Sequence, residues 1–411
     1  MGKKSTSSFT PEQEVLFSLL GHSLFDRDLS LPENVDWMAV YREAFVQTVG
    51  LQAFHKSPEY GIPSETEARI KQTLRRFMMR DAAVHAAHKR VHELMTQNGI
   101  PYVIIKGAAS AYYYPAPFLR GMGDVDFYVP DAWNETALGI LTRNGFTVTE
   151  NSSVYHTVLM ERGVKYELHR EIPGVPKGEA GNLVRKFRDG MTEQGIFTQT
   201  DSAVFNRPSP FHHGLILLLH TQQHLLNEGL GLRHLCDWAV FVASFPEDEF
   251  LRLMKEKLTY VGLWTFARIL SLAAVIAVGL EQRDWMTQDQ DDGRLALSLL
   301  QDFLSGGNFG AKDGDRSRVY ESKLISNQEK SRLDRSRAGN AMESVNNWIR
   351  DRWPAAKTCP LLLPFGWIYF LLRRFWLVMT GKKKRIEMKK TLENSSRRQD
   401  LYKRLRLFQL K

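Results

Sequence analysis

Apolar residues recur at helical spacing in the N-terminal part of the chain. Thr10 is a suitable N-cap, Pro11 suits the first helical position and Gln13 completes a capping box, so a helix is predicted to begin here. Its apolar face follows at Val15, Leu16, Leu19 and Leu20. Similar patterns predict further helices over Val35–Leu51 and Glu65–Asn98.

After Gly99, short apolar runs and alternation replace the helical spacing. Tyr102–Ile105 is an apolar run bounded by turn formers, which predicts a buried strand. Val125, Phe127 and Val129 alternate with Asp124, Asp126 and Tyr128, which predicts a second strand. The remaining predicted elements are a helix over Ala132–Asn144 and a hairpin of Val154–Glu161 and Val164–Arg170 around Arg162-Gly163.

Helical patterns return from Phe211 to about Leu304 and include a long apolar stretch, Gly262–Leu280. This stretch is about as long as a bilayer is thick. However, it contains Arg268, is rich in alanine and has no flanking basic cluster. We therefore expect a buried helix of the protein core rather than a membrane span.

A second apolar stretch, Pro360–Met379, is interrupted by two prolines and by Arg373-Arg374, and the basic run 382–385 follows it. Two interpretations stand. The mixture of aromatic, aliphatic and basic residues suits an interfacial helix on an anionic membrane through residues 360–390. Alternatively, the helix packs on the protein body and its basic end is solvated.

The patterns together predict an α+β fold, in which a small mixed β-sheet is flanked by N-terminal helices and a C-terminal helical bundle. Five regions are expected along the chain. They are an N-terminal helical region (1–98), a central core (99–172), a helical domain closing a cleft (173–310), a flexible polar linker (311–345) and a basic, aromatic C-terminal segment (346–411).

The composition is that of a globular protein, with 43% hydrophobic and 25% charged residues among 411, and it excludes collagen, a coiled-coil rod and a wholly disordered chain. The net charge of +9 is unevenly spread. Residues 311–411 hold 25 basic and 10 acidic groups, a net of +15, whereas the rest holds 30 and 36, a net of −6. Attraction to anionic lipid or nucleic acid should therefore come from the C-terminal quarter.

The cysteine content and the start of the chain indicate where the protein works. Two cysteines, Cys236 and Cys359, cannot form a disulfide scaffold, so we expect a reducing compartment. The first residues contain no apolar segment typical of a signal peptide. We predict a cytoplasmic protein, with peripheral contact at the inner face of the membrane if the basic segment binds lipid.

The acidic residues of the central region point to metal chemistry. Asp124 and Asp126 stand at i and i+2 of a predicted strand, so both carboxylates face one side. Their repulsion favours a divalent cation between them, and oxygen ligands favour Mg²⁺ or Mn²⁺. Glu167 and His169 share a face of the hairpin, and three carboxylates converge if that strand pairs beside the first. Such a trio can hold two metals that bind a triphosphate; otherwise, Asp-x-Asp is an ordinary solvated strand edge.

Residues near the first predicted strand could bind phosphate. Gly107 follows that strand and opens a short helix, where backbone N–H groups can approach phosphate, and Lys106 adds a positive charge. Taken alone, this signal is weak, because Gly107 is then an ordinary turn glycine and Lys106 an ordinary surface lysine. Arg120 could neutralise the triphosphate or the leaving pyrophosphate, or it could form a salt bridge with a nearby carboxylate.

His220 and His224 lie one helical turn apart, and Asp237 follows on the next helical segment. Such a histidine pair can bind zinc. The surrounding leucines instead favour hydrogen-bonded histidines that line a cleft between domains. In that position His224, Arg233 or Asp237 would contact nucleotide or acceptor.

Four linked motifs resemble the uncharacterised nucleotidyltransferase-like family of bacteria, within the DNA polymerase β-like nucleotidyltransferase superfamily. They are Ile105-Lys106-Gly107, Tyr114–Arg120 (YPAPFLR), Gly123–Asp126 (GDVD) and Glu167-Leu168-His169. The downstream part is also similar through His220, His224, Asp237 and 306–310, so the resemblance covers roughly residues 10–310.

The resemblance implies a mixed sheet with metal-binding carboxylates on neighbouring strands, and transfer of a nucleoside monophosphate from an NTP to a hydroxyl. Two features depart from the superfamily pattern. Gly107 is followed by Ala108 where serine is usual, so Ser110 or Lys106 would have to compensate, and the interval of 17 residues from Gly107 to Asp124 is long. The family has no settled reaction, so the activity is inferred for the class.

Three hypotheses follow. The first is a nucleotidyltransferase that uses Mg²⁺ or Mn²⁺ and an NTP, has Asp124, Asp126 and Glu167 as catalytic metal ligands, and acts on an unidentified hydroxyl acceptor. The alternative is a non-catalytic nucleotide-binding or scaffold protein whose basic tail docks on membrane or nucleic acid. The third is an RNA-modifying nucleotidyltransferase, which is less favoured because the tail lacks a recognised RNA-binding module.

Overall fold

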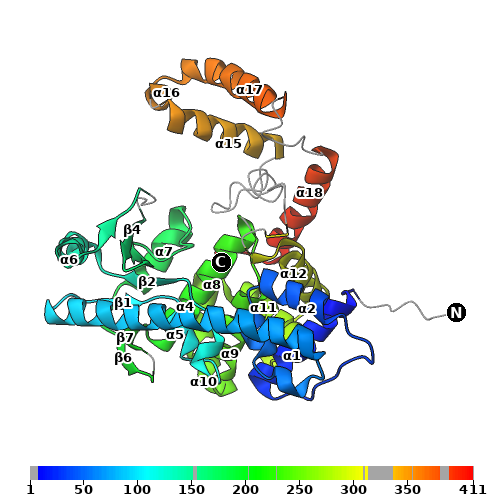
Figure 1. Cartoon of the computed structure of the whole chain (residues 1–411). Coiled ribbons are helices and arrows are strands. Elements are labelled where there is room, and N and C mark those ends of the chain that lie inside the picture. Colours follow the sequence, from blue (N-terminus) through cyan, green and yellow to red (C-terminus); the bar gives the residue numbers. More distant parts are fainter. Residues whose placement is uncertain are drawn as a thin grey trace.

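The long helix α4 (Ser64–Gln97) joins the two halves of the protein body, with the β-sheet at one end and the N-terminal helices at the other (Figure 1). The computed structural model describes residues 8–150, 155–201, 203–227, 229–308, 311–312, 337–353, 355–379 and 388–410. Its mixture of helices with a small mixed sheet confirms the predicted α+β class.

Five strands form the main sheet in the order β1-β2-β5-β4-β3. Their bounds are β1 Val103–Ile104, β2 Asp124–Tyr128, β3 Thr147–Val148, β4 His156–Glu161 and β5 Val164–His169. The β2–β5 pair is parallel and the other three pairs are antiparallel. The β4–β5 hairpin turns at Arg162 and Gly163, which both have positive φ, as a tight two-residue hairpin turn requires.

The two faces of the sheet differ because the strands alternate. One face carries apolar side chains that pack with α4 and with α6 (Asp131–Arg143) in a core of their own. Val125, Phe127, Tyr166 and Leu168 belong to that core. The opposite face carries the acidic and basic side chains of β2 and β5, so the period of two places all candidate ligands of these strands together.

The second and larger core belongs to the helices. The helices of the body are α1 (Pro11–Phe25), α2 (Trp37–Val46), α3 (Gly50–Phe54), α5 (Ala108–Ala111), α7 (Gly178–Arg188), α8 (Pro210–Leu226), α9 (Leu232–Ala243), α10 (Glu247–Tyr260), α11 (Trp264–Val278) and α12 (Asp292–Gly306). The predicted capping box is present: Gln13 N–H donates to Thr10 Oγ1, and Thr10 N–H donates to Gln13 Oε1. α11 is buried in this core, as predicted.

The predicted helix Val35–Leu51 is wrong in its second half, because the chain breaks between α2 and α3. Thr48 has a φ of 57°, and Val49 N–H bonds to the Ala44 carbonyl, which ends α2 in the manner of a Schellman motif. Glycine usually occupies the left-handed position, and threonine gives no such signal. A second omission is the small antiparallel sheet of β6 (Ile196–Gln199) and β7 (Val204–Arg207), which lies within the region expected to be helical.

The C-terminal segment contains α15 (Arg337–Arg352), α16 (Ala355–Thr358), α17 (Leu363–Met379) and α18 (Met388–Arg404). α15 and α17 pack against each other and stand apart from the body in Figure 1, whereas α18 packs on α12. Residues 337–345 of the expected linker are therefore helical, and 313–336 lie outside the described residues. Within the described chain, no helix combines the length and apolarity needed to cross a membrane.

Candidate functional site

The parallel pairing of β2 and β5 brings the acidic residues of both strands together. Asp126 lies opposite Glu167, and Asp124 lies opposite Lys165. Asp126 is almost fully buried, whereas Asp124 is partly exposed. Every second side chain of a strand projects from the same face, and directly opposite residues of paired strands share a face. The sheet therefore places the carboxylates of Asp124, Asp126 and Glu167 on its polar face.

Cationic side chains compensate this concentration of negative charge. Lys106 Nζ lies 2.7 Å from Asp126 Oδ1. Lys165 Nζ lies 2.6 Å from Asp124 Oδ2 and 2.8 Å from Glu167 Oε1. Two lysines therefore hold three carboxylates, and the polar face is close to electrical balance. Lys165 was not predicted as a site residue, although alternation along its strand places it on the same face as Glu167.

His169 completes the cluster from the end of β5. Its Nε2 lies 2.9 Å from Asp126 Oδ1 and 3.3 Å from Glu167 Oε2. Burial lowers the pKa of His169, but the carboxylates of Asp126 and Glu167 raise it by more, so the pKa lies above its usual value. The imidazolium form of His169 is thus stabilised between two acidic groups.

The carboxylates differ in their proton affinity. Burial raises the pKa of Asp126, but Lys106 and His169 outweigh it and hold that pKa well below the usual range. Glu167 follows the same pattern, and its pKa falls to about 2. Burial and the neighbouring Asp126 charge instead raise the pKa of Asp124. Asp126 and Glu167 are therefore the firmly ionised members of the group.

The carboxylates of this cluster suit a hard divalent cation. Ligand atoms of Asp126, Glu167 and His169 lie within 4.8 Å of one another. Asp124 stands beside this trio and is linked to Glu167 through Lys165. Carboxylate oxygens are the ligands that Mg²⁺ prefers. The Lys165 side chain, which contacts two of these carboxylates, is 41% exposed.

The predicted phosphate-binding segment lies beside the carboxylates. Gly107 has φ 57° and ψ −115° before the short helix α5, a conformation that residues with a side chain avoid. Ser110 on α5 is buried, and its hydroxyl has no hydrogen-bond partner among the described residues. Lys106 directly precedes this turn and points its ammonium group at Asp126.

Arg120 is held in a buried ion pair. Its Nε and Nη2 donate to the two carboxylate oxygens of Asp237 on α9 over 3.1 and 2.9 Å, and Tyr114 Oη donates to the same carboxylate over 2.7 Å. The Arg120 side chain is only 8% exposed. Both guanidinium contacts thus link α9 to the loop before β2. Of the two roles that the sequence allowed for Arg120, this contact is the salt bridge with a carboxylate.

A second cluster of ligand-type side chains lies on the helical side. One ring nitrogen from each of His220, His224 and His234 lies within 4.8 Å of the others. His220 and His224 come from α8, and His234 comes from the first turn of α9. Sequence spacing had indicated the first two. His234 was missed because nothing local relates the start of α9 to α8.

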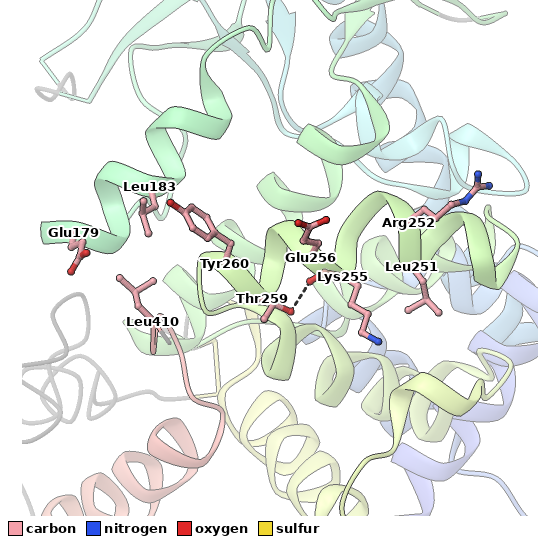
Figure 2. A pocket seen from close by; sticks show the side chains of 9 residues that line it. All are labelled: Glu179, Leu183, Leu251, Arg252, Lys255, Glu256, Thr259, Tyr260 and Leu410. Carbon is pink, nitrogen blue, oxygen red and sulfur yellow. Dashed lines mark hydrogen bonds between the residues drawn. The ribbon is translucent and has the colours of Figure 1, made fainter.

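A pocket of about 630 Å³ lies elsewhere, between α7 and α10 (Figure 2). Leu183, Tyr260 and Leu410 contribute to its wall, together with charged side chains of both signs. None of the predicted site residues lines it. The carboxylate cluster therefore lies outside this pocket.

A small mixed sheet with acidic side chains on adjoining parallel strands is typical of polymerase β-like nucleotidyltransferases. The model of a family described as uncharacterised nucleotidyltransferase matches residues 33–277, more than half of the chain, and the chain belongs to that family. The match confirms the resemblance inferred from the linked motifs, and it identifies a nucleotidyltransferase-type protein. A search of curated proteins returned no match.

Proposed function

We propose that the protein transfers a nucleoside monophosphate from an NTP to a hydroxyl group of an acceptor, with Mg²⁺ as cofactor. The observation that carries the proposal is the register of β2 and β5, which sets Asp126 opposite Glu167 with Asp124 two residues away. Membership of a nucleotidyltransferase family supports the same class of reaction. Mn²⁺ would suit the same oxygen ligands.

In this proposal Asp124, Asp126 and Glu167 hold the metal. When bound, the divalent cation supplies charge neutralisation for the triphosphate and polarises the attacking hydroxyl. The pKa of Glu167, about 2, suits a ligand that stays ionised rather than a proton acceptor, which works best with a pKa near the working pH. His169 positions both Asp126 and Glu167 by its two contacts.

The phosphates of the NTP would lie over Lys106 and the Gly107 turn. The positive φ of Gly107 turns the chain at the start of α5, so backbone N–H groups there can face an anion together with the Lys106 ammonium. The Ser110 hydroxyl, buried without a described partner, is a further donor in this segment. Arg120 would act through Asp237 by holding the helical part in place.

The test uses the four NTPs, each labelled at the α-phosphate, with Mg²⁺ and cell extract as the source of acceptor. We expect label to move onto an acceptor with the wild type and not with Asp126→Asn. Asp248→Asn is the matched control, because that aspartate is exposed on α10. Transfer that survives Asp126→Asn would refute the assignment. NTP binding without transfer by any nucleotide would favour the nucleotide-binding alternative.

We also propose that α17 docks on an anionic membrane surface. Phe365, Ile368, Leu372 and Trp376 recur at spacings of three and four residues, and each is more than half exposed. Such an apolar stripe, within the C-terminal quarter of the chain (residues 311–411) whose net charge is +15, suits the interface of anionic lipids. Nucleic acid is the less favoured partner, since aliphatic side chains such as Ile368 and Leu372 offer no stacking surface for bases.

A further inference from the structure

We propose that His220, His224 and His234 form a binding site for one Zn²⁺ ion. The site is distinct from the carboxylate cluster and does not depend on nucleotidyl transfer. Its ligands are imidazole nitrogens, which suit zinc, whereas the carboxylates suit magnesium. Three histidine ligands leave a fourth position for water or for an oxygen of a bound molecule.

The spacing of the three rings fits coordination. Nε2 of His220 lies 2.9 Å from Nε2 of His224, and the ligand nitrogens of all three histidines lie within 4.8 Å of one another. Around a tetrahedral zinc with Zn–N bonds of about 2.1 Å, ligand nitrogens are separated by about 3.4 Å. Small side-chain rotations would bring the trio to that separation.

Two helices make this arrangement rigid. His220 and His224 are one turn apart on α8, so their side chains project from the same face. His234 stands in the first turn of α9, which packs directly on α8. The ring centroid of His234 lies 5.1 Å from that of His220 and 5.4 Å from that of His224. The third ligand thus comes from a separate element, as in sites built between packed helices.

One ring nitrogen of the cluster is buried without a hydrogen bond in the described part of the chain. The short contact between His220 and His224 uses one proton between two Nε2 atoms. The buried Nδ1 of His234 has no hydrogen-bond partner among the described residues, and the side chain is almost fully enclosed. Burial of an unpartnered imidazole nitrogen is costly, and a metal bound by the trio would order its rings and compensate part of that cost.

The electrostatic setting keeps the imidazoles in the form that binds metal. Burial lowers the pKa of His220 and of His234 well below the usual range, and the pKa of His224 falls to about 4. All three are therefore neutral at physiological pH, so no proton must be displaced. The nearby charges of Lys106 and Arg233 contribute to these shifts and oppose a cation, while Asp126 acts on His224 in the opposite sense.

The first experiment measures zinc on the full-length protein. The protein is stripped with chelator, dialysed against a small excess of Zn²⁺ or of Mg²⁺, and analysed for bound metal. We expect about one zinc per chain in the wild type, a large loss in His224→Gln and in His220→Gln, and retention in Asp126→Asn. His156→Gln is the matched histidine control, since this histidine contacts His169 and lies outside the trio.

Cobalt provides a readout that does not depend on the variants. Co²⁺ with nitrogen ligands in a four-coordinate site absorbs visible light far more strongly than six-coordinate Co²⁺ among oxygen ligands. We expect the strong spectrum with wild-type protein and its displacement by Zn²⁺ but not by Mg²⁺. The proposal is overturned if stoichiometric zinc is absent, if zinc is lost with Asp126→Asn instead of His224→Gln, or if Co²⁺ gives only the weak spectrum. These results leave nucleotidyl transfer untouched, so the two proposals fail separately.

Discussion

The Lys165 ammonium bridges two carboxylates, since Nζ lies 2.6 Å from Oδ2 of Asp124 on the neighbouring strand and 2.8 Å from Oε1 of Glu167 on its own strand. Burial lowers the pKa of Lys165, but the two carboxylates raise it more, so the lysine remains charged. A metal held by these carboxylates, as proposed above, would compete with the lysine for the same oxygens.

Replacing this lysine should strengthen metal binding. In Lys165→Met, Asp124 and Glu167 lose their internal cation and become available to Mg²⁺. The Lys165 side chain is 41% exposed, so water weakens its ion pair with Asp124. We therefore expect a gain of about 1 kcal/mol, or roughly fivefold in Mg²⁺ affinity. Calorimetric titration of Mg²⁺ into wild type and variant measures it.

Lys89→Met is the control for the loss of one positive charge. Lys89 faces Glu93 on the exposed side of α4, well separated from β2 and β5 in the chain. Its replacement should leave the Mg²⁺ affinity unchanged. An affinity that stays constant or weakens in Lys165→Met would show that this lysine does not compete with the metal.

The Arg120–Asp237 pair should matter mainly for stability. In Arg120→Met, Asp237 would remain as a buried carboxylate with one hydroxyl donor, Tyr114. Removal of one partner from a buried ion pair typically lowers the free energy of unfolding by about 3–5 kcal/mol. Urea denaturation of the variant measures this loss.

The double variant Arg120→Met/Asp237→Leu should recover part of the loss, because no uncompensated charge remains buried. Arg69→Met is the matched control: its partner Glu65 is exposed, and a change below about 1 kcal/mol is expected. If Arg120→Met instead keeps its stability and loses NTP binding, the arginine binds phosphate directly and the structural role is wrong.

Local sequence signals were sufficient for much of the fold. The predicted helix Glu65–Asn98 agrees with α4 to one residue at each end, because its pattern is long and its flanks are turn formers. The strand of Asp124 and Asp126 and the turn at Arg162-Gly163 were also recovered. In each case the residues that determine the structure are neighbours in the chain.

The omissions involve partners that are distant in sequence. Arg120 meets Asp237 across 117 residues, and no periodicity relates the two positions. The β6–β7 hairpin was missed because its connection contains no glycine. In addition, Phe197 is apolar but exposed, so β6 does not show the alternation of apolar and polar residues that indicates a strand. His234 likewise joins His220 only through the packing of α9 on α8.

Stability should fall in mild acid because of His213. This side chain is buried, stacks with Tyr113, and has no hydrogen bond from either ring nitrogen among the described residues. Burial lowers its pKa to about 3 from the usual 6.5. Its contribution to stability is therefore complete above pH 6.5. As the pH falls from 6.5 towards 3, this histidine takes up a proton in the unfolded chain but not in the folded protein. The free energy of unfolding therefore decreases over this pH range.

His213→Phe replaces the imidazole by another aromatic ring, which does not titrate. Between pH 7 and pH 5 the free energy of unfolding of the wild type should drop by about 2 kcal/mol more than that of the variant. Urea unfolding curves at both pH values, followed by circular dichroism, provide the comparison. Equal pH dependence in the two proteins would show that His213 is protonated in the folded state or plays no part.

Membrane docking by α17 should depend on its apolar stripe. Phe365→Glu combined with Leu372→Glu places two charges where apolar side chains would enter the lipid interface. Burial of each large apolar side chain contributes about 1.5–3 kcal/mol, so binding should weaken by at least tenfold. Sedimentation with vesicles of phosphatidylglycerol and phosphatidylcholine measures the bound fraction, and vesicles of phosphatidylcholine alone should bind little at the same salt concentration.

Met79→Glu distinguishes the α17 stripe from apolar exposure in general. Met79 is 76% exposed on α4, in the body of the protein, and its replacement should leave vesicle binding intact. Binding that is equally strong to neutral vesicles, or that persists in the double variant, would contradict docking through α17. Saturable binding of RNA that competes with vesicles would instead assign the basic segment to nucleic acid. Because electrostatic attraction weakens with salt in both cases, only the loss caused by the two apolar replacements identifies insertion into lipid.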